Sequence, residues 1–187
     1  MRIVGGSLKG KNLFTPKDNA VRPTSDRVRE SLFNILAHGI ENLELEGAYI
    51  ADLFAGTGAL GIEALSRGAQ WCLFVDDAAA SRGLIRENTM ALGLNGKSKI
   101  SRQDATDIGP RSKRSPQFDL VFADPPYNKG LGEKALASLH IHGWLKPNAI
   151  LVLEETKRAT IEMPDCFDII DERKYGDTQI IISRYKG

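Results

Sequence analysis

The chain has 187 residues, of which 42% are hydrophobic and 26% charged, and its net charge is +1. These values are typical of a globular domain with a sizeable core, and they exclude a disordered or fibrous chain. The opening MRIVGGSLKG lacks the apolar region of a signal peptide, and no apolar run approaches the length of a membrane span. The two cysteines and three histidines form no metal-ligand pattern. We therefore expect one domain over residues 1–187, cytoplasmic and without a bound metal ion.

The first thirty residues are basic, with seven Lys or Arg residues against three acidic ones. Two short strands around residues 2–4 and 11–14 flank the turn-rich GGSLKG, which predicts a small hairpin, and an extended link with Pro16 and Pro23 follows. Such charge is compatible with a surface that binds nucleic acid, although a merely solvated basic end explains it equally well. We expect a basic hairpin arm over about residues 1–23.

A helix should follow this arm, with Thr24 or Ser25 as its N-cap and its end near Gly39. Its apolar side chains recur at helical spacing and form one face, at Val28, Leu32, Ile35 and Leu36.

From Gly47 onward, short apolar runs alternate with helical segments. Strands are predicted over residues 48–54, 71–76, 99–102, 118–123 and 149–155, and helices over 59–67, 78–92 and 132–139. Alternation of this kind indicates a parallel sheet covered by helices on both faces. The last two strands, 167–176 and 178–187, are too close together for a helical crossover. The expected fold is α/β and Rossmann-like, with a mostly parallel seven-stranded sheet that ends in an antiparallel hairpin.

The segment ADLFAGTGALG joins the first of these strands to its helix, and Gly56, Gly58 and Gly61 satisfy the GxGxxG pattern of dinucleotide-binding proteins. Asp52 argues against a pyrophosphate, because its carboxylate precedes the loop and would repel phosphate charge. A cationic ligand without phosphate fits better, and S-adenosylmethionine carries both a sulfonium and an ammonium group. The alternative is a tight strand-to-helix turn that binds nothing.

Two further acidic positions end neighbouring strands of the predicted sheet. Asp76 could accept hydrogen bonds from ribose hydroxyls, although the adjacent Asp77 leaves the choice between the two open. Asp104, which precedes Ala105, could accept a hydrogen bond from an adenine amino group, or it could simply be a surface acid or a helix cap. Ligands of open parallel sheets bind at the carboxyl ends of the strands, where all these acids fall.

The fourth sheet strand ends in Asp124-Pro125-Pro126-Tyr127. The exocyclic amine of a nucleobase is a poor nucleophile, and it gains positive charge when it attacks a methyl sulfonium. A carboxylate and a carbonyl oxygen fixed by the rigid prolines would accept its N–H bonds and favour that state. Tyr127 offers a flat face on which the base can stack. The structural alternative is a proline turn capped by an aspartate.

Together these segments resemble the bacterial 16S ribosomal RNA guanine-N2 methyltransferases, a family of class I S-adenosylmethionine-dependent enzymes. The resemblance covers nearly the whole chain. The glycine loop and DPPY are shared by many amino-methyltransferases, whereas RPTSDRVRESLFNIL at residues 22–36 is the specific part, and MRIVGGSLKGKNL and KYGDT add to it. The implied reaction is methylation of a guanine N2 in 16S RNA, by a monomer acting on a small-subunit particle.

The resemblance also implies residue roles. Cofactor contacts are expected at Asp52, Phe54, Gly56, Gly58, Asp76, Asp104 and Ala105, with Thr24 and Arg29 closing over the methionine end. RNA contacts are expected at Arg2, Lys9, Lys11, Lys17 and Arg22. The family often has arginine where Lys9 and Lys11 stand and glutamate where Asp76 stands, which leaves the details of RNA binding open.

Three alternatives remain on sequence grounds. A DNA or other RNA amino-methyltransferase, acting on adenine N6 or cytosine N4, shares DPPY but usually carries a target-recognition insertion for which this chain has no room. An NAD-binding oxidoreductase shares the glycine pattern but not Asp52 or DPPY. A catalytically inactive RNA-binding module would not need DPPY.

Overall fold

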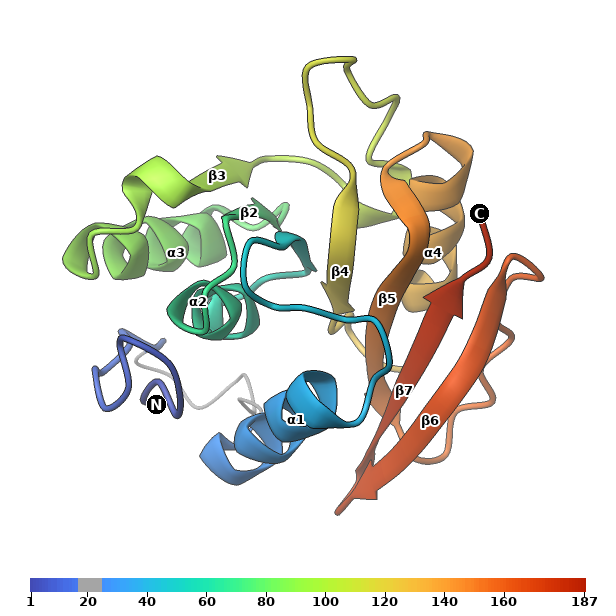
Figure 1. Cartoon of the computed structure of the whole chain (residues 1–187), viewed down its shortest axis with the longest axis horizontal. Helices are drawn as coiled ribbons and strands as arrows, with labels where there is room; N and C mark the ends of the chain where they lie inside the picture. Colours follow the sequence, from blue (N-terminus) through green and yellow to red (C-terminus); the bar gives the residue numbers. More distant parts are fainter. Residues whose placement is uncertain (17–24) are drawn as a thin grey trace.

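The computed structural model describes residues 1–16 and 25–187 (Figure 1). The contacts expected from Lys17, Arg22 and Thr24 therefore lie outside the described residues. Helix α1 spans Asp26–His38, and its N-cap is Ser25, whose side chain accepts a hydrogen bond from the backbone N–H of Val28. The helix ends at Gly39, as its sequence predicts.

Seven strands form one sheet in the order β3-β2-β1-β4-β5-β7-β6. Their bounds are β1 Tyr49–Leu53, β2 Trp71–Val75, β3 Ser98–Ser101, β4 Phe118–Ala123, β5 Leu145–Thr156, β6 Phe167–Tyr175 and β7 Thr178–Tyr185. The strands from β3 to β5 pair in parallel, and β7 pairs antiparallel with both β5 and β6. This arrangement confirms the predicted fold. Strand β5 begins earlier than predicted, because Leu145 pairs with Phe118 across a register shift.

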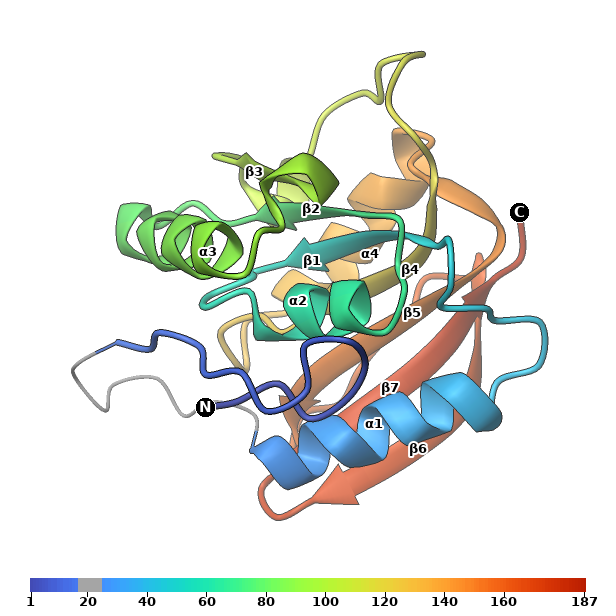
Figure 2. The ribbon, with the colours of Figure 1, turned by 60° about the vertical axis from the view of Figure 1, so that its left-hand side comes forward.

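Helices cover both faces of this sheet (Figure 2). The remaining helices are α2 Ala59–Ser66, α3 Ala79–Ala91 and α4 Leu131–Ile141, with the short 3₁₀ helices η1 Asn95–Lys97 and η2 Ala105–Asp107. Alternate side chains of each strand point to opposite faces. One set packs with α1, α2 and α3, and the other packs with α4. Within the described ranges, no helix is long and apolar enough to cross a membrane.

The described part of the N-terminal arm, residues 1–16, is an irregular hairpin that lies against α2 (Figure 2). Its strands meet in a single bridge between Arg2 and Asn12. The arm is fixed by side chains of other elements: the N–H of Val4 donates to Glu63, and the N–H of Phe14 donates to Asn88. The backbone of residues 1–16 is therefore part of the folded protein, while the side chains of Lys9 and Lys11 extend into solvent.

Candidate functional site

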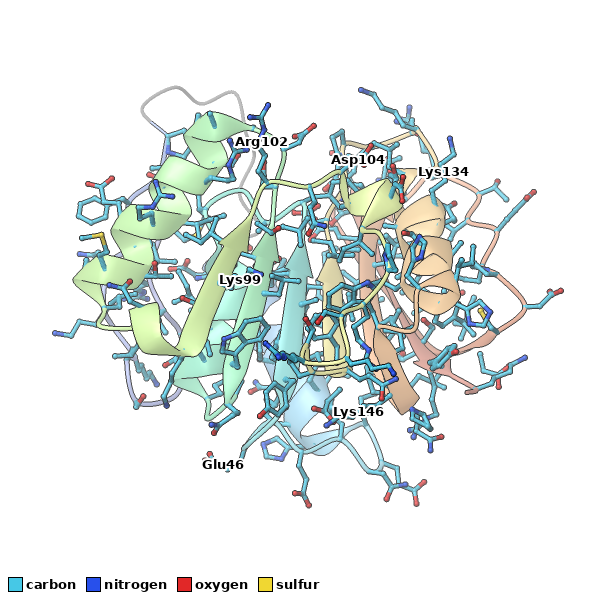
Figure 3. The ribbon with its side chains drawn as sticks, turned by 90° about the horizontal axis from the view of Figure 1, so that it is seen from above. Glu46, Lys99, Arg102, Asp104, Lys134 and Lys146 are labelled. Carbon is cyan, nitrogen blue, oxygen red and sulfur yellow. The ribbon has the colours of Figure 1, made fainter. Side chains whose placement is uncertain are left out.

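A cavity of about 630 Å³ opens at the carboxyl ends of the central strands. Its lining comes from the segments that follow β1, β2, β3 and β4, as the rule for open parallel sheets requires. Figure 3 labels Asp104 at this edge of the sheet, while Glu46 and Lys146 lie at the opposite edge. Among the residues predicted to form the site, those that line the cavity are Phe54, Asp76, Asp104, Ala105, Asp124, Pro125, Pro126 and Tyr127.

The glycine loop reverses the chain between β1 and α2 through three residues in the left-handed backbone region, Phe54 (φ 56°), Gly56 (φ 55°) and Gly58 (φ 78°). A bulky side chain rarely adopts such a conformation, and residues that do so cluster at functional sites. Gly61 has a different role, because a Cβ there would lie 2.4 Å from the ring of Phe74. The loop thus combines a tight turn with close packing of α2 on the sheet.

Asp76 holds this loop in place. One of its carboxylate oxygens accepts the N–H of Gly56 and the other accepts the N–H of Ala78, each at 2.9 Å. Asp77 is exposed and also lines the cavity, so both remain candidates for binding a ribose.

Asp52 lies behind the glycine loop and is absent from the cavity lining, which differs from the expectation that its carboxylate faces the ligand. It is 2% exposed and accepts the N–H of Gly61 at 2.9 Å. Burial raises the pKa of Asp52 to about 8, the negative charge of Asp76 adds to that increase, and the hydrogen bond from Gly61 opposes it. Asp52 therefore connects the end of β1 to the first turn of α2 by a buried hydrogen bond.

Asp104 caps η2 while it lines the cavity. Its carboxylate accepts the N–H of Thr106 at 2.8 Å and the hydroxyl of the same residue at 2.6 Å. These hydrogen bonds lower the pKa of Asp104. Asp104 can therefore cap η2 and present an acidic group to the cavity in the same conformation.

Strand β4 delivers Asp124 to the cavity beside Pro125, which is buried. Within residues 1–16 and 25–187, no donor forms a hydrogen bond to the Asp124 carboxylate. Desolvation raises the pKa of Asp124 well above its usual range, and the charges of Glu154, Asp52 and Glu155 raise it further. The cavity therefore contains a carboxyl group whose acceptor capacity is unused by these parts of the chain.

Tyr127 is 36% exposed, and its hydroxyl donates to Glu154 at 2.9 Å. Burial raises the pKa of Tyr127, with a contribution from the charge of Glu154. The next residue, Asn128, donates its N–H to Glu155. Sequence reasoning missed both glutamates, although two adjacent acids at the end of an apolar strand are an unusual enough pattern to have marked them.

Arg29 does not line the cavity, and its expected role at the methionine end of a cofactor stays a prediction. Its side chain is buried and pairs with Asp26 at 2.9 Å and with the buried Glu63 at 3.7 Å. It also donates to the carbonyl oxygen of Arg2. Because a buried carboxylate needs a counter-charge, Arg29 joins α1, α2 and the arm.

The expected RNA contacts on the arm lie outside the cavity. Lys9 and Lys11 are exposed. Arg2 is exposed as well, and its guanidinium pairs with Asp26 at 3.3 Å. The arm thus presents positive charge to solvent close to α1 and α2.

Comparisons with known proteins agree with this geometry. The family described as Conserved hypothetical protein 95 matches residues 1–184. Ribosomal RNA small subunit methyltransferase D of Haemophilus influenzae is 33% identical over 177 residues, covering 94% of this chain and 89% of that protein. The enzyme of the same name from Escherichia coli is 37% identical over 155 residues, covering 82% of this chain and 74% of its own length.

A solved structure agrees with these sequence comparisons. The methyltransferase candidate yhhF of Escherichia coli superposes with a TM-score of 0.84 at 29% identity, over 100% of this chain and 98% of that one. Since the family match spans almost the whole chain and both curated relatives exceed 30% identity, this protein belongs to the Conserved hypothetical protein 95 family of S-adenosylmethionine-dependent ribosomal RNA methyltransferases.

Proposed function

We propose that this chain transfers a methyl group from S-adenosylmethionine to the exocyclic N2 amine of a guanine in 16S ribosomal RNA, within a small-subunit particle. The observation that carries the proposal is the Asp124 carboxylate, which faces the same cavity as Phe54 of the glycine loop and accepts no hydrogen bond from the described residues. An amine that must shed positive charge needs such an acceptor.

The cavity fits a cofactor of this kind. Its volume of about 630 Å³ lies within the usual range for small-molecule sites. Asp76, Asp77, Asp104 and Asp124 all line it, and an acidic lining favours a cationic ligand with hydroxyl and amino donors over a dinucleotide diphosphate. Asp76 or Asp77 would hold the ribose, Asp104 the adenine amino group, and Phe54 and the glycine loop the remaining part. The bound cofactor supplies an electrophilic methyl group on a sulfonium.

The residues at the end of β4 would act on the target base. The Asp124 carboxylate accepts one N–H of the exocyclic amine, and the rigid backbone at Pro125 and Pro126 directs a carbonyl oxygen to the other. Both contacts strengthen as the nitrogen becomes positive, so they favour the transition state more than the ground state. The ring of Tyr127 stacks on the base and holds the amine in line for attack.

A target in small-subunit ribosomal RNA is supported by the names of the curated relatives. The choice of guanine N2 rests on the resemblance of residues 22–36 to the guanine-N2 methyltransferases. Lys9 and Lys11 on the arm would bind phosphates of the RNA and position it over the cavity.

A direct test supplies labelled S-adenosylmethionine with small subunits, naked 16S RNA or duplex DNA. We expect label in the RNA of small subunits and little or none in DNA. Labelling of DNA alone would contradict the proposal and favour an adenine N6 or cytosine N4 enzyme. Binding of NAD tighter than that of S-adenosylmethionine would contradict the cofactor assignment.

A further inference from the structure

Two consecutive acids at the end of β5 lie behind the part of the cavity that would hold the target base. Glu154 is 7% exposed and Glu155 is 4% exposed, and neither belongs to the cavity lining. Burial of a carboxylate is unfavourable unless hydrogen bonds compensate for lost water. The contacts of these two side chains therefore indicate what they stabilise.

Glu154 restrains the residue that would stack on the base. Its Oε1 atom accepts the Tyr127 hydroxyl at 2.9 Å, across 27 residues of sequence. The Tyr127 side chain lines the cavity and is only partly exposed, so this bond fixes the far end of its ring. A ring fixed at its hydroxyl cannot swing about the Cα–Cβ bond without losing a charge-assisted hydrogen bond.

Glu155 restrains the backbone just after that ring. Its two carboxylate oxygens lie 3.1 and 3.2 Å from the N–H of Asn128, and one of them also accepts the N–H of Thr156 at 2.7 Å. Asn128 has a φ of 61°, in the left-handed region that asparagine adopts more readily than most non-glycine residues. The hydrogen bonds from its N–H to Glu155 tie this turn to the end of β5.

We propose that Glu154 and Glu155 are positioning residues that fix the Tyr127 ring and the loop behind it as a preformed platform for the target base. This inference rests on the proposed methyl transfer. The two carboxylates do not touch the reacting atoms. They act through Tyr127 and Asn128, by keeping the amine of a stacked base aligned for attack, and such alignment affects turnover more than cofactor binding.

The first experiment compares Tyr127→Phe, Glu154→Ala and Glu154→Gln in steady-state methylation of small subunits. The glutamine variant keeps an oxygen acceptor, whereas the other two lose the hydrogen bond. We expect kcat to fall about 10-fold to 100-fold in Tyr127→Phe and Glu154→Ala, while KM for S-adenosylmethionine stays within about 2-fold. Glu154→Gln should restore kcat to within about 3-fold of the wild type at its pH optimum.

The matched control is Glu172→Gln, which changes an exposed carboxylate on the edge strand β6 and should leave kcat unchanged. A double variant, Tyr127→Phe with Glu154→Ala, should be no slower than either single variant, because both remove the same bond. Additive losses in the double variant, or wild-type kcat in Glu154→Ala, would overturn the inference. If Glu154→Ala fails to fold, Tyr127→Phe, which deletes a single oxygen atom, decides the question.

The second experiment needs no activity. Hydrogen exchange of the Asn128 amide should be more than about 10-fold faster in Glu155→Ala than in the wild type and unchanged in Glu172→Gln. Equal exchange rates in Glu155→Ala and wild type would overturn the role of Glu155. A wild-type chain that methylates no RNA overturns both proposals, whereas an active wild type with unaffected variants overturns only this one.

Discussion

The two sides of the cavity use carboxylates in opposite ways. On the side of the glycine loop, Asp52, Asp76 and Asp104 each accept at least one backbone N–H. On the side of β4, Asp124 accepts none from the described residues and lies close to the charge of Glu154. Acids that accept backbone N–H groups hold the turns around them in place. An acid left without donors, among like charges, keeps its acceptor capacity for a ligand.

The largest effect should follow from removal of Asp124, which accepts no hydrogen bond from the described residues. In Asp124→Ala, methyl transfer should fall at least about 100-fold to 1,000-fold, because the amine loses its charged acceptor in the transition state. Cofactor and RNA affinities should change little, as filter binding and calorimetry can measure. Asp104→Ala, on the opposite side of the cavity, is the matched control and should mainly raise KM for the cofactor. Unchanged methylation by Asp124→Ala would end the mechanism proposed here.

Asp52 tests the side of the glycine loop through the pH dependence of protein stability. Because burial raises its pKa to about 8 from an ordinary value of 3.8, the folded state retains a proton that the unfolded chain releases. The stabilising effect of that proton is complete below about pH 4 and is lost as the pH rises toward 8. Asp52→Asn keeps an acceptor for Gly61 and cannot ionise. As the pH rises from 5 to 8, the unfolding free energy of Asp52→Asn should increase relative to that of the wild type, by at most about 4 kcal/mol.

Denaturant unfolding at several pH values measures this difference. A constant gap between Asp52→Asn and wild type across that range would show that Asp52 is ionised at neutral pH despite its burial.

A smaller effect should link Asp124, which follows β4, to Glu154, which lies at the end of β5. The charge of Glu154 contributes to the raised pKa of Asp124, so Glu154→Gln should lower that pKa. The ionised form of Asp124 is the acceptor, and activity falls as the pH drops through its pKa. The acid limb of the kcat/KM profile should therefore move to lower pH in Glu154→Gln, whereas Glu172→Gln should leave it in place. Movement to higher pH would contradict the electrostatic picture.

The smallest effect on chemistry should come from the arm. Replacement of Lys9 and Lys11 by alanine should weaken RNA binding and reduce its salt dependence by about two phosphate contacts, with little change in cofactor affinity. RNA affinity measured over a range of salt concentrations tests this. An equal fall in cofactor affinity would mean that these side chains support the structure of the site.

The sequence predicted features that depend on local pattern. Strand-helix alternation predicted the sheet, and the positions of DPPY and the glycine loop at strand ends predicted that they share one edge. What it did not predict depends on partners far away along the chain. The ion pair between Arg29 and Glu63, which lie on different helices, cannot be recognised from spacing. Glu154 contacts Tyr127 only after β4 and β5 pair, and the position of Asp52 behind the loop depends on how α2 packs.

The central claim is that this cavity methylates the N2 amine of a guanine. The most direct measurement digests small-subunit RNA after incubation with the wild-type chain and labelled S-adenosylmethionine, and identifies the labelled nucleoside by mass spectrometry. The proposal predicts N2-methylguanosine at a defined position with wild type and its loss with Asp124→Ala. Label in N6-methyladenosine, in N4-methylcytidine, or in N2-methylguanosine formed equally well by Asp124→Ala would contradict it.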